Sequence, residues 1–132
     1  MPPECLPIRV YYEDTDAGGI VYHTNYLKYM ERARTEYFQT RFGKDLFALQ
    51  AQCHVQFVIG HISIDFLKPA VLGQHLIVQS QAEMGRRASI QFEQTVVTKE
   101  AQTILCKAVI KVVCVNKEGK PCALPDFMRR TS

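Results

Sequence analysis

Residues 9–37 (RVYYEDTDAGGIVYHTNYLKYMERARTEY) change periodicity twice, and this change constrains the fold more than any other feature. Within residues 8–13, Val10 and Tyr12 alternate with Tyr11 and Glu13, and this two-residue period predicts a strand. Residues 14–19 hold two aspartates and two glycines, a composition that favours a loop. Apolar side chains then recur at helical spacing, which predicts a helix over residues 25–41 that ends at Gly43. The chain therefore passes from strand to helix through a glycine-rich loop that carries carboxylates.

The size and charge of the chain narrow its class. A length of 132 residues predicts a single domain over 1–132. A net charge of +3, without clustered Lys and Arg between aromatic residues, argues against nucleic acid but suits a polyanionic small molecule. No apolar run approaches the ~18 residues of a membrane span. The first residues lack the pattern of a signal peptide, so we expect a cytoplasmic protein with no membrane span.

The cysteines and histidines do not predict a metal or cofactor. Five cysteines are an odd number and show no CxxC spacing, and Cys106 and Cys114 lie in an apolar strand pattern typical of reduced core thiols. The histidines outside the loop, His54, His61 and His75, show no HxH or HxxxH spacing. We therefore expect no metal site and no cofactor.

Beyond the first helix the chain is mostly strand-like. Alternating patterns predict four further strands, over residues 54–66, 76–84, 88–98 and 102–115. Asp45 is expected to cap a short helical turn, and Gly60 suggests a bulge. Pro121 and Pro125 discourage strand in the tail.

Short turns between successive strands imply antiparallel pairing. The sequence thus predicts an α+β fold in which a five-stranded antiparallel sheet wraps around one long central helix. Such a sheet leaves edges and one face uncovered, which predicts a homo-oligomer.

The start of the predicted helix has the parts for acyl-transfer chemistry. A helix N-terminus presents unpaired N–H groups and a partial positive charge, which can stabilise an oxyanion. Asp16 is the candidate carboxylate, although loops of this composition also favour a purely structural turn aspartate. Asp14 is expected to be that turn residue, with little cost on its loss. The N–H groups around Tyr22, His23 and Thr24 are the candidate oxyanion hole.

Several motifs resemble a known family. The segments that carry the resemblance are TDAGGIVYH at residues 15–23, the helix YLKYMERAR at 26–34 with Asn25 before it, IDFLKPA at 64–70, and Tyr12. They resemble the hotdog-fold thioesterases of the 4-hydroxybenzoyl-CoA thioesterase class, most closely the YbgC-like acyl-CoA thioesterases associated with the Tol-Pal system. The similarity runs from about residue 8 to residue 115.

The resemblance implies a hotdog fold whose sheets join edge to edge in a dimer, often doubled to a homotetramer. It implies hydrolysis of acyl-CoA thioesters at sites between subunits. Asp16 would act as nucleophile or general base, and the residues leave both roles open. His23 would orient or polarise the thioester or help in proton transfer, and the alternative is a structural histidine hydrogen-bonded to the loop. Tyr12 is a weaker third catalytic candidate, and Gly19, with Tyr22 and Thr24, would position the substrate.

The CoA end of the substrate has one candidate site. Arg86, Arg87 and Ser89 lie at a predicted hairpin and could hold phosphates, or could be solvated turn residues. Two rival functions remain open. One is a thioesterase acting on acyl-carrier protein, and the other is a non-catalytic protein that binds acyl-CoA or serves as a scaffold.

Overall fold

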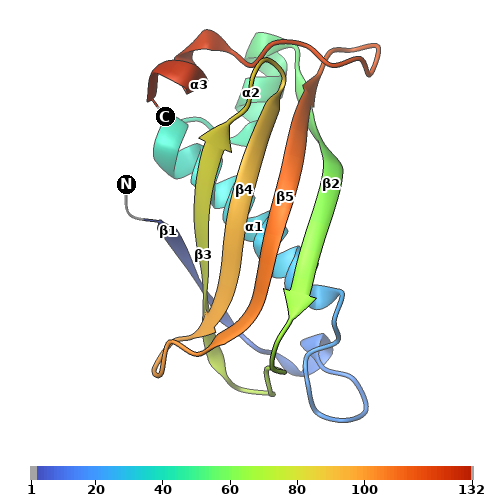
Figure 1. Ribbon diagram of the computed structural model, residues 1–132, viewed down its shortest axis with the longest axis vertical. Helices are drawn as coiled ribbons and strands as arrows, with labels where there is room; N and C mark the ends of the chain where they lie inside the picture. Colours follow the sequence, from blue (N-terminus) through green and yellow to red (C-terminus); the bar gives the residue numbers. More distant parts are fainter. Residues whose placement is uncertain (1–2, 132) are drawn as a thin grey trace.

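The computed structural model describes residues 3–131, which form one antiparallel sheet packed on a long helix (Figure 1). The strands are β1 (Glu4–Arg9), β2 (Gln56–Phe66), β3 (His75–Met84), β4 (Ser89–Thr98) and β5 (Ile104–Val115). The helices are a short 3-10 turn η1 (Tyr12–Asp14), α1 (Asn25–Phe42), α2 (Leu46–Cys53) and α3 (Asp126–Thr131). The strand order is β1-β3-β4-β5-β2, with every neighbouring pair antiparallel. The predicted α+β hotdog fold is confirmed.

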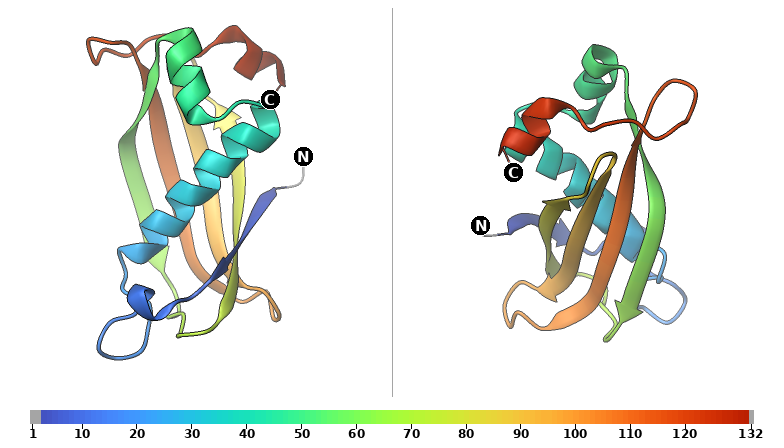
Figure 2. Two further views of the ribbon diagram at one scale, coloured as in Figure 1. Left: turned by 180° about the vertical axis from the view of Figure 1, so that it is seen from behind. Right: turned by 45° about the horizontal axis from the view of Figure 1, so that its top comes forward.

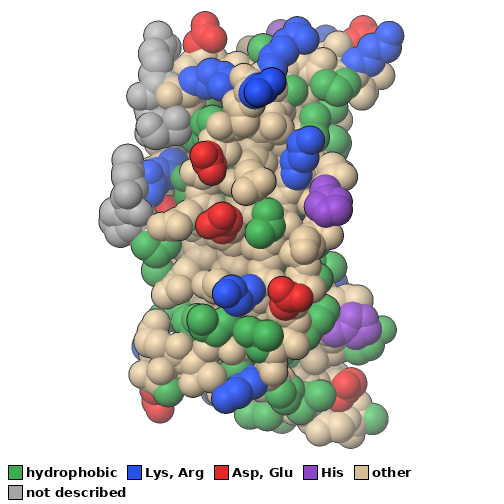
Figure 3. Space-filling model, in the orientation of Figure 1, with side chains coloured by type: hydrophobic (Ala, Val, Ile, Leu, Met, Phe, Trp, Pro, Cys, Tyr) green, Lys and Arg blue, Asp and Glu red, His purple; other side chains and the backbone are tan. Residues whose placement is uncertain are grey.

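Helix α1 crosses one face of the sheet diagonally (Figure 2). Its sheet-facing stripe is buried and consists of Tyr26, Tyr29, Met30, Ala33, Tyr37 and Phe38. Inward-facing residues of the central strands complete this core, among them Leu76, Ile90, Phe92 and Ile110. The opposite face of the sheet has no helix over it and carries charged and polar side chains (Figure 3). The helix thus covers only one of the two sheet faces.

The first strand differs from its prediction. The strand is Glu4–Arg9, not residues 8–13, and it is an edge strand that pairs with β3. Pro7 fits there because an edge strand tolerates a residue without an N–H. Beyond it the Tyr11 N–H donates to the Asp14 carboxylate at 2.9 Å, which turns the chain into η1.

Other local predictions are confirmed with small changes of boundary. Gly43 ends α1 in the left-handed region with φ of +68°, and Asp45 caps α2 by accepting the Ala48 N–H at 2.7 Å. Gly60 lies at a register shift between β2 and β5. A Cβ at this position would stand 2.9 Å from Val113 Cγ2, so the bulge needs glycine.

The tail departs from the sequence expectation in a second place. Residues after Pro125 form α3, which the periodicity did not predict. Arg129 of this helix reaches back to the turn between β3 and β4. Across residues 3–131, no helix combines the length and the apolar character that a bilayer span requires.

Candidate active site

The loop between η1 and α1 lies at one end of the sheet, beside the connection from β2 to β3 (Figures 1 and 2). It is a narrow hairpin in which the Asp16 N–H donates to the Ile20 carbonyl at 2.9 Å. Gly19 makes its turn with φ of +77°, a conformation that glycine adopts without strain. The Val21 N–H donates to the Ala70 carbonyl at 2.9 Å, which fixes the hairpin to the neighbouring connection.

Asp16 lies at the exposed tip of this hairpin. One carboxylate oxygen, Oδ1, accepts the Gly18 N–H at 2.8 Å. The other oxygen has no hydrogen-bond partner within the part of the chain that the structure describes. A carboxylate held on one side and open on the other can approach a bound substrate without first losing its anchor.

Three N–H groups before the first turn of α1 have different surroundings. The Tyr22 N–H already donates to the Asp14 carbonyl at 2.9 Å, so Tyr22 does not fit the predicted role of a free donor in this structure. The N–H groups of His23 and Thr24 have no acceptor among residues 3–131. The Thr24 side chain makes no capping bond. The helix start therefore offers two donors and the positive end of its dipole.

Asp14 and Asn25 connect the hairpin to α1. Asn25 is 9% exposed, and its Nδ2 donates to the Asp14 carbonyl at 2.8 Å while its backbone N–H donates to the Tyr22 carbonyl at 2.9 Å. Asp14 also holds η1 through its carboxylate. Two of these bonds are accepted by the Asp14 carbonyl and would remain in Asp14→Ala, so its side chain contributes only the bond from the Tyr11 N–H. The small cost expected for its loss stays a prediction. The sequence placed Asn25 just before the helix motif of residues 26–34 but did not indicate the long-range bond of its side chain.

Tyr26 and Tyr29 lie behind the loop in the core. The Tyr26 hydroxyl accepts the Ala70 N–H at 2.9 Å, whereas the buried Tyr29 hydroxyl has no hydrogen-bond partner in the described chain. Burial, followed by the nearby Asp14 carboxylate, raises the pKa of Tyr29. That carboxylate is near enough to interact with the hydroxyl and to add to the shift that burial produces.

His23 lies on an aromatic surface beside the loop. Its ring centroid is 4.6 Å from that of Tyr22 and 6.0 Å from that of Phe66, the latter edge-on. The predicted catalytic residue Tyr12 is 81% exposed in η1, and its carbonyl accepts the Thr15 hydroxyl at 2.8 Å. The Tyr12 ring has no contact with Asp16 that would indicate a shared role within one chain.

The predicted CoA-binding turn lies at the opposite end of the sheet (Figure 1). The ten residues of β3 separate it from the Asp16 loop by roughly 30 Å. Arg86 and Arg87 are exposed there. Ser89 is partly buried and folds into the turn, because its Oγ occupies the space where Gly85 lacks a side chain. One chain therefore does not bring Arg86 or Arg87 to its own Asp16.

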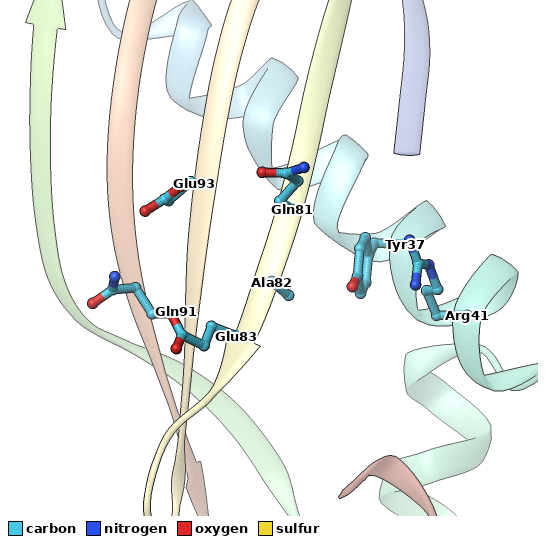
Figure 4. A pocket seen from close by; sticks show the side chains of 7 residues that line it. All are labelled: Tyr37, Arg41, Gln81, Ala82, Glu83, Gln91 and Glu93. Carbon is cyan, nitrogen blue, oxygen red and sulfur yellow. The ribbon is translucent and has the colours of Figure 1, made fainter. Parts of the chain in front are cut away.

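Figure 4 shows a cavity of about 360 Å³ at a different place. It lies along the part of β3 beyond Ser80, where β1 no longer pairs with it, and between this edge and α1. The side chains that line it include Tyr37, Glu83 and Glu93. The cavity is remote from Asp16 and His23, so we do not assign the substrate to it.

Known proteins resemble this chain in both sequence and fold. Residues 10–131 match the thioesterase-like superfamily. The acyl-CoA thioesterase YbgC of Haemophilus influenzae is 42% identical over 125 residues, covering 94% of this chain and 90% of the relative. A probable thioesterase from Bartonella henselae superposes with a TM-score of 0.86 at 31% identity, covering 93% of this chain and 99% of that one.

A 1,4-dihydroxy-2-naphthoyl-CoA thioesterase from Synechocystis superposes with a TM-score of 0.90, covering 98% of this chain and 94% of that one. At 23% identity this likeness shows the fold alone. Within residues 3–131, no three His, Cys, Asp or Glu side chains gather as ligands for a metal ion.

Proposed function

Because this chain belongs to the thioesterase-like superfamily, we propose that it hydrolyses acyl-CoA thioesters to a free acid and CoA through Asp16. The observation that carries the proposal is local. The open carboxylate oxygen of Asp16 lies on a hairpin fixed beside the unpaired N–H groups of His23 and Thr24. A carboxylate and two donors at a helix start are the parts that attack at a thioester carbonyl requires.

Asp16 has two possible roles in this reaction. As a nucleophile, its open oxygen attacks the thioester carbonyl, expels the CoA thiolate and leaves a mixed anhydride that water hydrolyses. As a general base, it takes a proton from the attacking water. Thiolate is a good leaving group, so neither route needs a strong general acid. A single turnover in ¹⁸O-labelled water tests for the nucleophilic route, because water that attacks the Asp16 carbonyl of the anhydride leaves label in the carboxylate, whereas the general-base route puts label only in the product acid.

The two N–H groups of His23 and Thr24 would receive the oxyanion that forms during attack. Loss of one such donor typically lowers the rate by ~10²–10³. Around them lies exposed apolar surface for the acyl group, made by Ile20, Tyr22, Phe66, Leu67, Val71 and Leu72. The His23 ring borders this surface and would orient the thioester.

A second subunit would complete the site. Strand β2 has a free edge of 11 residues, and its inward-facing Ile59 and Phe66 remain 46% and 48% exposed. Long apolar edges of this kind pair with another strand. Antiparallel pairing of two β2 edges reverses the partner, so its Arg86–Arg87 turn would lie at the sheet end that carries Asp16. We therefore assign the CoA phosphates to the arginine turn of a partner subunit.

Hydrolysis of a panel of acyl-CoAs, from acetyl to palmitoyl and benzoyl, tests the proposal through release of free thiol. Asp16→Ala should lower kcat by at least ~100-fold on every substrate that wild type cleaves. Glu13→Gln is the matched control, because Glu13 is an exposed carboxylate of the same segment with no hydrogen bond in the described chain. Full activity of Asp16→Ala would overturn the assignment.

Acyl-carrier protein is the second candidate substrate. Exposed basic side chains gather at the Arg86–Arg87 end of the sheet, where Lys117 and Lys120 also lie (Figure 3), and an acidic carrier could dock there. Much faster turnover of an acyl-carrier protein than of the matching acyl-CoA would favour it. Binding of acyl-CoA without turnover, unaffected by Asp16→Ala, would instead favour a non-catalytic binding protein. A pull-down partner whose capture depends on surface residues but not on Asp16 would favour a scaffold.

A further inference from the structure

Two cysteines that the proposed chemistry does not use lie side by side at the end of β5. Their Sγ atoms are 3.7 Å apart in the reduced protein. Cys114 is fully buried on β5, and Cys122 is partly exposed in the segment that follows the next turn. One thiol of the pair is therefore accessible to a small reagent, and the other is its immediate neighbour.

The backbone holds the two residues opposite each other. Val115 bridges to Pro121, which places Cys114 directly across from Cys122. The Cys122 N–H donates to the Cys114 carbonyl at 2.9 Å, and the Asn116 N–H donates to the Lys120 carbonyl at 2.8 Å. The Cys114 N–H donates to the Ala88 carbonyl on the other side, so the pair shares one backbone bond. The two Sγ atoms, 3.7 Å apart, must approach to the ~2.05 Å of a disulfide. A bond between the two sulfurs thus needs side-chain rotation and little backbone movement.

We propose that Cys114 and Cys122 form an oxidation site, at which a hydroperoxide converts the two thiols to an intramolecular disulfide. This inference does not depend on the proposed hydrolysis. It gives a function to Cys114, which the sequence indicated only as a reduced core thiol, and to Cys122, to which the sequence assigned no role.

The order of attack follows from exposure. Burial, followed by the hydrogen bond to Cys122, raises the pKa of Cys114, so the first attack on peroxide falls to the accessible Cys122. Its sulfur takes one oxygen from hydrogen peroxide and becomes a sulfenic acid, with release of one water. The Cys114 sulfur then attacks the Cys122 sulfur, loses its proton and displaces a second water. Two thiols are oxidised by two electrons in total, and one peroxide is reduced to two waters.

The bond would fix the tail that supports the arginine turn. Cys122 precedes α3, and the Arg129 guanidinium of α3 donates to the carbonyls of Gly85, Arg86 and Arg87. Joining Cys122 to β5 therefore anchors the segment through which Arg129 reaches the β3–β4 turn. The Asp16 loop lies at the other end of the sheet and is not touched by this bond.

The test treats the full, reduced chain with hydrogen peroxide under native conditions, blocks the remaining thiols and maps unreduced tryptic peptides. Trypsin places Cys114 in residues 112–117 and Cys122 in residues 118–129, so the bond joins two separate peptides. We expect this cross-linked pair, at two hydrogens below the summed mass. The count of free thiols should fall by two from the five of the reduced chain.

Two variants control the assignment. Cys122→Ser, at a partly exposed position, should abolish the cross-link, whereas Cys5→Ser removes an exposed cysteine elsewhere and should leave it unchanged. The proposal is overturned if native protein loses no thiols, if Cys122 proceeds to sulfinic acid without the cross-link, or if the bonds join other cysteines or two chains.

Discussion

At the Asp16 end of the sheet, backbone hydrogen bonds join the loop to η1, to α1 and to the β2–β3 connection. At the Arg86–Arg87 end, the side chain of Arg129 holds three carbonyls of the β3–β4 turn at 2.6–3.0 Å. The first end uses its own N–H groups for support, and within residues 3–131 those of His23 and Thr24 at the helix start have no acceptor. The second end receives its donors from a distant helix and exposes two cations.

The two kinds of support suit two different roles, a reacting centre at the Asp16 end and a phosphate contact at the Arg86–Arg87 end. A reacting centre needs donors fixed before the substrate arrives, and a network of backbone bonds supplies that rigidity. A contact for phosphates needs accessible charge more than exact geometry, and arginines on a turn supply it. Disruption of the first end should therefore lower kcat, whereas disruption of the second should change stability or KM.

Asn25→Ala should produce the largest change at the Asp16 end after loss of Asp16 itself. It removes the side-chain bond between the start of α1 and the Asp14 carbonyl. Displacement of catalytic groups by about 1 Å can cost ~10² in rate. The Asp14 carbonyl keeps the Tyr22 N–H, so loss of the one bond should cost ~0.5–1.5 kcal/mol of unfolding free energy. Steady-state kinetics and urea unfolding measure both.

Asn116→Ala is the matched control at the other end. The Asn116 side chain accepts the N–H groups of Glu118 and Lys120 at 3.0 Å, so its loss should destabilise a turn without lowering kcat. Equal kcat values in Asn25→Ala and wild type would contradict the proposed difference between the ends.

Arg129→Gln should destabilise the protein without slowing the chemical step. The change removes charge-assisted hydrogen bonds to three carbonyls. A hydrogen bond to a charged group typically contributes ~1.5–3 kcal/mol to the free energy of unfolding. We expect a lower urea midpoint and an unchanged kcat for acyl-CoA at saturating substrate. A kcat that falls together with the urea midpoint would contradict this prediction, because it would show that Arg129 also supports the Asp16 loop.

The double variant Arg86→Ala, Arg87→Ala should raise KM for acyl-CoA. Exposed charge pairs contribute ~0.2–1 kcal/mol each, so the loss of two predicts a rise of roughly twofold to thirtyfold, with kcat unchanged. A truncated thioester that lacks the nucleotide is the control substrate, since its KM should not respond. An equal rise in KM for both substrates would remove these arginines from the CoA site.

Tyr29→Phe should have the smallest effect at pH 7. Its hydroxyl is buried without a partner, so its removal should leave the unfolding free energy equal or higher by up to ~1 kcal/mol. Tyr26→Phe is the matched control one turn earlier in the helix face, because its hydroxyl is the acceptor of the Ala70 N–H. Urea unfolding should show a loss for Tyr26→Phe only.

Tyr29→Phe should also change how the stability of the protein depends on pH. Burial, with the interaction of its hydroxyl with Asp14 second, raises the pKa of Tyr29 above the ordinary 10.0. Above pH 10 the unfolded chain loses this proton while the folded chain keeps it, so stability is full below pH 10 and falls as the pH rises. Tyr29→Phe should show a shallower fall between about pH 10 and 11. An identical fall in both proteins would contradict the raised pKa.

Much of the fold could be predicted from local pattern. The helical stripe, the left-handed cap at Gly43 and the bulge at Gly60 depend on neighbouring residues and on glycine geometry, which a sequence displays directly. The first strand and α3 could not be placed in this way. Glu4–Arg9 is a strand because β3 offers it an edge, and the short α3 packs against α1 and the β3–β4 turn.

The sequence by itself determined the strand–loop–helix order and the presence of Asp16 and His23 in that loop, because periodicity and turn composition are local properties. Only the tertiary structure decided which donors remain free. Tyr22, His23 and Thr24 look alike as successive residues before a helix, yet only the Tyr22 N–H meets the Asp14 carbonyl. The tertiary structure likewise placed Arg86 and Cys122 beside residues that are distant in the sequence. Such contacts depend on strand register and on reversals of the chain.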